Sequence, residues 1–120
     1  MKEEKSMRKY EKIFKALSDP NRLRILKMLE NGSLCVCEIR DVLNLANSTV
    51  SKHLSLLRDA GFILNEKNGK WVYYKLNQKA EEPHVKSLMK LMHEWMNDED
   101  MIKADKRKLV KVDRNIICKV

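Results

Sequence analysis

The chain has 120 residues, of which 43% are hydrophobic and 35% charged, so we expect one globular domain with a single core. Lys and Arg number 25 against 17 Asp and Glu, and the net charge of +8 favours a polyanionic partner such as nucleic acid. Aromatic residues make up only 6%, which argues against a single-strand binder built on stacking. There is no long apolar run and no secretory segment, so we expect a cytoplasmic protein without membrane contact.

The first third of the chain has the periodicity of two helices. From Met7 to Leu17, apolar residues recur at spacings of three and four. Asp19 is the expected N-cap of a second helix, with Pro20 at its first position. We expect this helix to end at Gly32, because glycine tolerates a left-handed C-cap.

A helix-turn-helix is expected next. Ser33 is a possible N-cap for a short helix over residues 35–43, and a turn follows over residues 44–46. Asn47 or Ser48 is expected to cap the next helix, which ends near Gly61. Its inward face is expected to carry Val50, Leu54 and Leu57. Two short helices joined by a brief turn are typical of this DNA-binding motif.

A β-hairpin should follow the second helix of this motif. Residues 62–67 and 70–76 are rich in β-prone side chains and flank Asn68 and Gly69. We expect these two residues to occupy both turn positions with positive φ. A hairpin directly behind a helix-turn-helix is a wing, so the predicted fold is mainly α, a winged helix-turn-helix with a small β-hairpin.

The chain returns to helical periodicity at Pro83, with a wide apolar stripe that reaches Met96. A domain of this size can hardly bury both this stripe and that of the first helix, so we expect a homodimer formed through the terminal helices. The alternative is that the two helices pack together within one subunit. We place the folded domain at residues 1–98 and expect a polar, basic tail of undetermined structure over residues 99–120.

The expected reading helix carries short polar and basic side chains on its N-terminal exposed face. Such a face can contact base edges and phosphates, although it can equally be an ordinary solvated surface. A homodimer would place two reading helices about 34–36 Å apart and read pseudo-palindromic double-stranded operator DNA. The candidate DNA contacts on the helix are Ser48, Thr49, Ser51, Lys52 and His53, and those at the wing tip are Lys67, Asn68 and Lys70.

Five segments in unbroken order carry a family resemblance. They are Ser18-Asp-Pro-Asn-Arg-Leu-Arg-Ile-Leu26, Leu34-Cys-Val-Cys-Glu-Ile39, Ser48-Thr-Val-Ser-Lys-His-Leu54, Leu57-Arg-Asp-Ala-Gly61 and Trp71-Val-Tyr-Tyr74. From about residue 10 to residue 96 the chain resembles the ArsR-type winged-helix metalloregulators. The resemblance implies a transcriptional repressor that leaves its operator when an inducer binds.

Cys35 and Cys37 are the candidate inducer ligands. Helix N-termini lower thiol pKa values, so we expect partly ionised thiols that react with soft ions. In the resembled family the Cys-Val-Cys stretch is the arsenite-responsive motif, which implies As(III), Sb(III) or a methylated arsenical as inducer. Other soft metal ions stay open, and no permanent cofactor is expected. The alternative is that both cysteines are small buried apolar residues.

The spacing of this pair suggests a mechanism. Residues i and i+2 on an α-helix lie about 200° apart, so one ion cannot hold both sulfurs unless the helix distorts. We expect that distortion to displace the reading helix. Members of the resembled family often have a third cysteine where this chain has Arg40. Cys118 is a tentative third ligand, although two sulfurs can suffice and Cys118 can be an incidental thiol.

Other interpretations remain at this point. His84 and His93 lie on the last helix, where other members of the resembled family bind zinc, but their surroundings make surface or interface histidines the expectation. A thiol-redox regulator of the same fold is the main alternative function. A thiol-redox enzyme is disfavoured because no βαβ pattern surrounds the cysteines. An architectural DNA protein without a ligand also stays open. No catalytic triad or phosphate-binding glycine loop is present, so we do not expect an enzyme.

Overall fold

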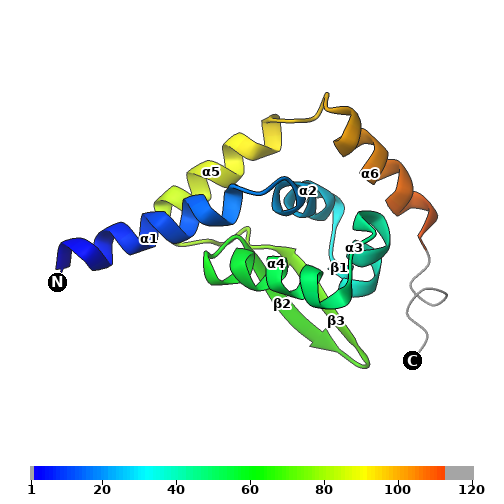
Figure 1. Ribbon diagram of the computed structural model, residues 1–120, viewed down its shortest axis with the longest axis horizontal. Coiled ribbons are helices and arrows are strands. Elements are labelled where there is room, and N and C mark those ends of the chain that lie inside the picture. Colours follow the sequence, from blue (N-terminus) through cyan, green and yellow to red (C-terminus); the bar gives the residue numbers. More distant parts are fainter. Residues whose placement is uncertain (1, 113–120) are drawn as a thin grey trace.

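The computed structural model describes residues 2–112, with side chains from residue 7 onward. The fold is mainly helical with one small sheet, and it confirms the expected winged helix-turn-helix (Figure 1). The elements in chain order are α1 (Lys2–Leu17), α2 (Pro20–Met28), the 3₁₀ turn η1 (Leu29–Asn31), β1 (Leu34–Cys35), α3 (Val36–Leu43), α4 (Asn47–Asp59), β2 (Ile63–Asn68), β3 (Trp71–Leu76), α5 (Pro83–Glu94) and α6 (Asp100–Lys111).

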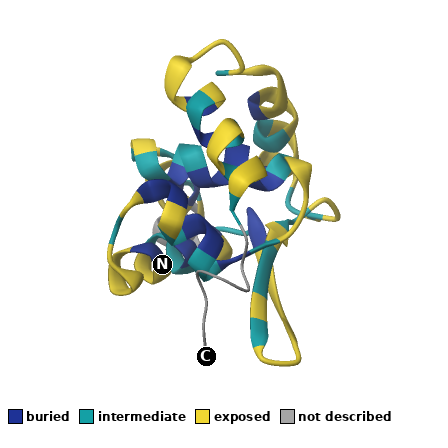
Figure 2. Cartoon of the chain, turned by 90° about the vertical axis from the view of Figure 1, so that its right-hand side faces the viewer, coloured by how far each residue is buried: buried dark blue, intermediate teal, exposed yellow. Residues whose placement is uncertain are grey.

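The core lies where α1 to α4 meet the base of the sheet, and the wing projects away from it (Figure 2). Val50, Leu54 and Leu57 are completely buried, which confirms the expected inward face of α4. Burial of each such side chain contributes about 1.5–3 kcal/mol to folding. The opposite face of α4 is thereby fixed toward solvent.

The start of α2 follows its sequence signal. The Asp19 carboxylate accepts hydrogen bonds from the backbone N–H groups of Asn21 at 2.8 Å and Arg22 at 3.3 Å, and Pro20 occupies the first helical position. A side-chain cap of this kind stabilises a helix by about 1 kcal/mol. The expected start is confirmed. The α-helix itself ends earlier, at Met28, and Gly32 ends the 3₁₀ turn that follows, with φ of 138° and ψ of 179° instead of the expected left-handed cap.

The wing turn lies one residue later than expected. β2 pairs with β3 from Ile63 opposite Leu76 to Asn68 opposite Trp71, so Gly69 and Lys70 form the two-residue loop. Only Gly69 in this loop has a positive φ, at 64°, and Asn68 is a strand residue. This pattern fits a turn with glycine at its first central position, whereas the expected turn needs two positive φ values.

A short strand was not expected before α3. Leu34 pairs with Tyr74 and Cys35 pairs with Tyr73, so β1 joins the wing sheet in the order β1-β3-β2. Cys35 is therefore the N-cap of α3, with extended φ and ψ, and the expected cap at Ser33 is wrong. The backbone N–H of Cys35 donates to Glu38 Oε1 at 2.9 Å, which completes a capping box.

The start of α4 also differs by one position. The helix begins at Asn47 with Ala46 at its N-cap, so neither Asn47 nor Ser48 is the cap. Its end follows the expectation, because Gly61 lies just beyond the C-cap Ala60 with φ of 92°. The helix is 13 residues long, and its first turn carries the candidate reading residues.

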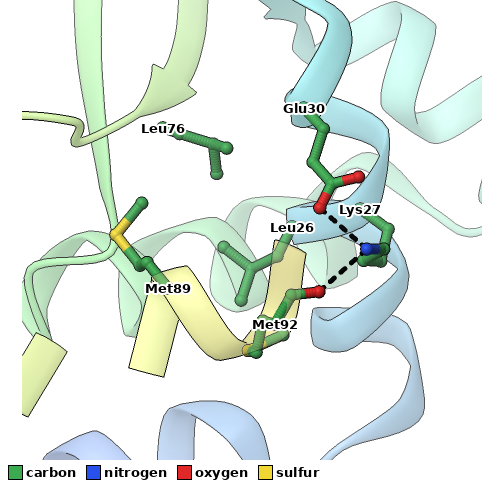
Figure 3. A pocket seen from close by; sticks show the side chains of 6 residues that line it. All are labelled: Leu26, Lys27, Glu30, Leu76, Met89 and Met92. Carbon is green, nitrogen blue, oxygen red and sulfur yellow. Dashed lines mark hydrogen bonds and ion pairs between the residues drawn. The ribbon is translucent and has the colours of Figure 1, made fainter. Parts of the chain in front are cut away.

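α5 is fastened to α2 by a buried lysine. Lys27 is 1% exposed, and its ammonium group donates to Glu30 Oε2 and to the Met92 carbonyl oxygen, each at 2.8 Å (Figure 3). Pro83 lies in the first turn of α5 as expected, after the N-cap Glu82. A buried ammonium is tolerated only when paired and hydrogen-bonded, so this contact fixes where α5 lies.

A sixth helix occupies part of the segment expected to be a polar tail. α6 packs against α2 and α3, and it buries Ile102 and Asp105. The Asp105 carboxylate accepts two hydrogen bonds from Arg24, both 2.8 Å long. Residues 100–111 are therefore packed on the rest of the domain, beyond the expected boundary at residue 98.

Candidate nucleic-acid interface and thiol site

The exposed face of α4 carries the candidate reading residues together. Ser48, Thr49, Lys52 and His53 line one open hollow in the surface, and Arg22 from α2 completes its wall. Ser51 is exposed on the same helix but does not line the hollow. Because the apolar side of α4 is packed into the core, these polar groups are held at the surface by a rigid element.

Arg22 is the residue of this hollow that the sequence analysis missed. It is 8% exposed, and its Nε and Nη2 donate to the carbonyl oxygens of Ala16 at 2.9 Å and Lys15 at 3.0 Å, at the end of α1. Its Nη1 lies 2.9 Å from His53 Nδ1. In the sequence it reads as an ordinary basic residue of α2, since no local pattern points to a partner 31 residues away.

His53 is partly buried and close to charged groups. Burial is the main cause that lowers its pKa, and the positive charges of Arg22 and Lys52 lower it further, while Asp19 opposes them. A neutral imidazole is therefore favoured at this position.

The wing tip presents the other three candidates. Lys67, Asn68 and Lys70 are all exposed. The Lys70 ammonium lies 4.9 Å from the centre of the Trp71 ring, a cation–π distance that steadies the tip. On the hairpin's side, Glu66 and Lys75 form a 3.3 Å ion pair. The wing projects beyond the body of the domain (Figure 2), and its tip carries the ammonium groups of Lys67 and Lys70.

The thiol site differs from its expectation in two ways. Cys35 is 2% exposed and lies at the end of β1 rather than in a helix. Burial raises the pKa of its thiol and outweighs the backbone hydrogen bonds that lower it. The expected partial ionisation is wrong for Cys35, and the argument from helical spacing does not apply because only Cys37 is a helix residue.

Cys37 lies in the first turn of α3 and is partly exposed. Cys118, the tentative third ligand, lies outside the described residues. Over residues 7–112, no group of three or more His, Cys, Asp or Glu side chains is arranged to hold a metal ion.

The two α5 histidines are surface residues within one subunit. His84 is exposed, and its Nδ1 lies 2.9 Å from Glu82 Oε1 while its ring meets the Tyr10 ring edge-on at 4.9 Å. The His93 side chain is 76% exposed and lies 3.5 Å from Glu30. Their partners are different carboxylates.

A set of large apolar side chains on the terminal helices remains exposed. On α1 and α5 these are Met7 at 64%, Phe14 at 60%, Leu91 at 44% and Trp95 at 51%. Other exposed large apolar side chains are Leu64 and Val72 on the wing and Met101 and Val110 on α6. Clusters of exposed apolar groups are typical of an interaction surface. We call the four residues on α1 and α5 the terminal-helix face.

Comparison with known proteins places this geometry in a family. The family model described as "Bacterial regulatory protein, arsR family" matches residues 19–64, from the cap of α2 into the wing. The arsenical resistance operon repressor of Escherichia coli is 37% identical over 102 residues, which cover 82% of this chain and 83% of that protein. The chain belongs to the arsR family. An uncharacterized HTH-type transcriptional regulator of Methanocaldococcus jannaschii is 47% identical over 92 residues, covering 73% of this chain and 99% of that protein.

Solved structures agree with membership of the arsR family. HlyU from Vibrio cholerae is 34% identical with a TM-score of 0.61, covering 76% of this chain and 95% of that one. A Mycobacterium bovis domain titled as a homodimeric winged helix-turn-helix DNA-binding domain has a TM-score of 0.63 at 24% identity, covers 76% of this chain and 81% of that one, and shows the shared fold. The arsR family consists of transcriptional regulators rather than a class of enzymes. Among the described residues, no helix is both long and apolar enough to cross a bilayer.

Proposed function

We propose that this arsR-family regulator is a repressor that binds double-stranded operator DNA as a homodimer and is released when a thiophilic metalloid binds its cysteines. The observation that carries the DNA-binding part is the hollow on α4, where Ser48, Thr49, Lys52 and His53 meet on one rigid exposed face. Hydroxyl, ammonium and imidazole groups are the side chains that contact phosphates and base edges in the major groove. The wing residues Lys67, Asn68 and Lys70 would contact the neighbouring backbone or minor groove.

The homodimer part is supported by the terminal-helix face. In a monomer, Phe14 and Trp95 would leave apolar area exposed to water. A two-fold interface would bury the same residues on both copies. Two copies of α4 related in this way would read a pseudo-palindromic site with half-sites about one duplex turn apart.

The inducer part is supported by relatives and by the thiol pair. The Escherichia coli relative is named for arsenical resistance, and a Staphylococcus aureus relative, 42% identical over 79 residues, for cadmium resistance. As(III) and Sb(III) are the proposed inducers, with methylated arsenicals and other soft ions as further candidates. Cys35 and Cys37 would supply sulfur ligands, and Cys118 is the proposed third.

Binding would require Cys35 to leave its buried position. Cys35 is buried at the junction of β1 and α3, where the β1–β3 pairing and the Glu38 capping contact hold its backbone. α3 packs directly against α4. A soft ion that draws Cys35 outward would therefore loosen the element behind the reading helix. Coupling between two sites is typically about 1–3 kcal/mol, and a complete switch needs about 5.5 kcal/mol.

The test is operator binding by fluorescence anisotropy, using a duplex selected from random sequence for tight binding. Arsenite, antimonite, cadmium and zinc are added in turn to reduced wild type and to Cys35→Ser, Cys37→Ser and Cys118→Ser. We expect wild type to bind, arsenite or antimonite to release it, and Cys35→Ser and Cys37→Ser to bind without release. Failure to select any duplex would refute DNA binding. Full release of Cys35→Ser and Cys37→Ser from the duplex by arsenite or antimonite would refute the thiol site.

A thiol-redox regulator is the second candidate, and one observation favours it. The similar proteins include a structure titled reduced HlyU from Vibrio cholerae, 32% identical with a TM-score of 0.62, covering 80% of this chain and 97% of that one. In this alternative, oxidation of a thiol replaces metalloid binding as the signal. Operator affinity measured with and without dithiothreitol, in the absence of any metal, separates the two. A change of more than tenfold favours redox sensing, and an unchanged affinity opposes it.

A further inference from the structure

We infer that Arg22 fixes His53 as a neutral imidazole protonated on Nε2, so that His53 offers a single hydrogen-bond donor to an acceptor on the DNA. The second half of this inference rests on the proposed DNA binding, while the first half concerns the free protein alone. Arg22 is thus a positioning residue, and His53 is the residue that would touch the ligand.

The hydrogen bond between the two residues has only one possible direction. A guanidinium group carries donors and no acceptor, so in the 2.9 Å contact Arg22 Nη1 donates and His53 Nδ1 accepts through its lone pair. A neutral imidazole that accepts at Nδ1 must carry its proton on Nε2. A second proton on Nδ1 would point one N–H at another and would place a positive ring against Arg22.

Arg22 is held too firmly to turn away from this contact. Its Nε donates to the Ala16 carbonyl oxygen and its Nη2 to the Lys15 carbonyl oxygen, both at the end of α1, and the side chain is almost fully buried. The guanidinium plane is therefore set by α1 and α2, and its Nη1 nitrogen is directed at His53 on α4. This three-way contact joins the frame of the domain to the reading helix.

Burial and the positive charges near His53 oppose a protonated ring, and one nearby carboxylate favours it. Lys52 on α4 and Arg22 on α2 both oppose a positive ring, and Asp19, before α2, is the group that favours one. Burial opposes the charged ring as well. The ring is therefore expected to stay neutral at a pH where a free histidine, with a pKa near about 6.5, is half protonated.

An Nε2–H donor in the hollow selects acceptors. The acceptor groups that DNA offers to a reading helix are phosphate oxygens and, on the base edges of the major groove, N7 and O6 of guanine, N7 of adenine and O4 of thymine. The same donor would oppose the amino groups of cytosine and adenine. His53 in this state would therefore position α4 against a phosphate, or read one base edge.

The ring nitrogens of His53 give the first test, without DNA. Proton–nitrogen correlation spectra of the 120-residue protein distinguish a protonated from an unprotonated ring nitrogen. We expect one protonated nitrogen, Nε2, and a titration midpoint below that of a free histidine. A protonated Nδ1 at neutral pH would overturn the inference, whether or not the protein binds DNA. In Arg22→Gln the midpoint of the His53 titration should rise. Because this variant can lose the contact with α1, its thermal unfolding is measured as well, to check that it is folded.

Two substitutions of His53 give the second test, because they retain opposite halves of the imidazole. His53→Gln places an amide donor near the position of Nε2, and His53→Asn places an amide near Nδ1, where its oxygen can still accept from Arg22. We expect His53→Gln to keep operator affinity within about threefold and His53→Asn to lose about tenfold, the effect of one hydrogen bond. The reverse order would show that His53 serves only to satisfy Arg22. Wild type that binds no duplex would instead refute the proposed function.

A comparison of selected with unrelated duplexes shows whether the acceptor for His53 is a phosphate or a base edge. If His53→Asn weakens selected and unrelated duplexes equally, the acceptor is a phosphate. If it weakens only the selected duplex, the acceptor is a base edge. Replacing single guanines and adenines by their 7-deaza analogues then tests the N7 acceptors: where N7 is the acceptor, the difference between wild type and His53→Asn should vanish at that one position, and where it is O6 or O4 the difference should remain.

Discussion

Arg24 and Asp105 form a buried pair in which two 2.8 Å hydrogen bonds join α2 to α6 across 81 residues. The Asp105 side chain is 2% exposed and that of Arg24 is 15% exposed. A bidentate contact of this kind between planar groups fixes orientation as well as distance. Together with the burial of Ile102 and the Lys106–Glu30 ion pair, it joins α6 to the rest of the domain.

The first prediction concerns this pair. Asp105→Ala leaves the Arg24 guanidinium without its partner, and removal of one member of a buried pair is strongly destabilising. Because Arg24 retains some solvent, we expect a loss of about 2–3 kcal/mol in the free energy of unfolding, measured with urea. The matched control is Asp59→Ala, whose pair with Arg58 is 56% and 42% exposed, and it should cost less than about 0.5 kcal/mol. Equal losses in the two variants would contradict the assignment.

The second prediction is the pH dependence of stability at Cys35. Because burial raises the thiol pKa in the folded protein, the folded state favours the protonated thiol. The stability that this contributes is complete below the unfolded pKa of about 8.5 and is lost as the pH rises through the folded value. Chemical unfolding of the reduced protein between pH 7 and 10 should therefore show a decline that Cys35→Ala lessens. An identical decline in wild type and Cys35→Ala would refute a raised thiol pKa at Cys35.

The third prediction concerns the reactivity of the same thiol. A buried, protonated cysteine reacts slowly with iodoacetamide at neutral pH, since the thiolate is the nucleophile. Mass spectrometry of the reduced folded protein should find Cys35 alkylated much more slowly than Cys37, and equally fast in urea. Faster labelling of Cys35 in the folded state would contradict the burial described above.

The fourth prediction concerns Glu82 at the start of α5. The hydrogen bond from His84 is the main cause that lowers its pKa to about 2, and the Val85 backbone N–H and Lys9 lower it further. The stability that follows is present above the ordinary glutamate value and is lost as the pH falls through about 2. A carboxyl titration by NMR should show this midpoint, and His84→Ala should move it upward. An ordinary glutamate midpoint in wild type would contradict the hydrogen bond between Glu82 and His84.

The fifth prediction is the oligomeric state. Phe14→Glu and Trp95→Glu together place charges on the terminal-helix face, and we expect sedimentation to show a folded monomer where wild type is a dimer. Val110→Glu is the control, since Val110 is 86% exposed on α6, outside this face. If the wild type is itself a monomer at micromolar concentration, the terminal-helix face is not a dimer interface.

The parts of the fold that sequence predicts well are those with local signals. The Asp19 cap and the Gly61 terminus depend on residues within a few positions of each other, and the inward face of α4 on a repeat of three and four. The five sequence segments that resemble the family predicted the winged helix-turn-helix as a whole. These features need no knowledge of distant partners.

Most of the missed features depend on distant partners, whereas the wing turn and the cap of α4 are local features displaced by one residue. Pairing of Leu34 with Tyr74 makes Cys35 a strand residue, although its neighbours favour a helix. α6 has a polar composition and is fixed by Asp105, which looks like a surface acid until Arg24 is beside it. The link from Arg22 to His53 likewise spans 31 residues. In the wing, a one-residue change of register moved the turn to Gly69 and Lys70.

The most direct test of the switch is hydrogen exchange of the operator complex during addition of arsenite. If the inducer acts by drawing Cys35 out of its buried position, amides of residues 34–38 should exchange faster with arsenite, and those of α4 should follow as DNA is released. Cys35→Ser should show neither change. Release of DNA while residues 34–38 keep their protection would contradict the account.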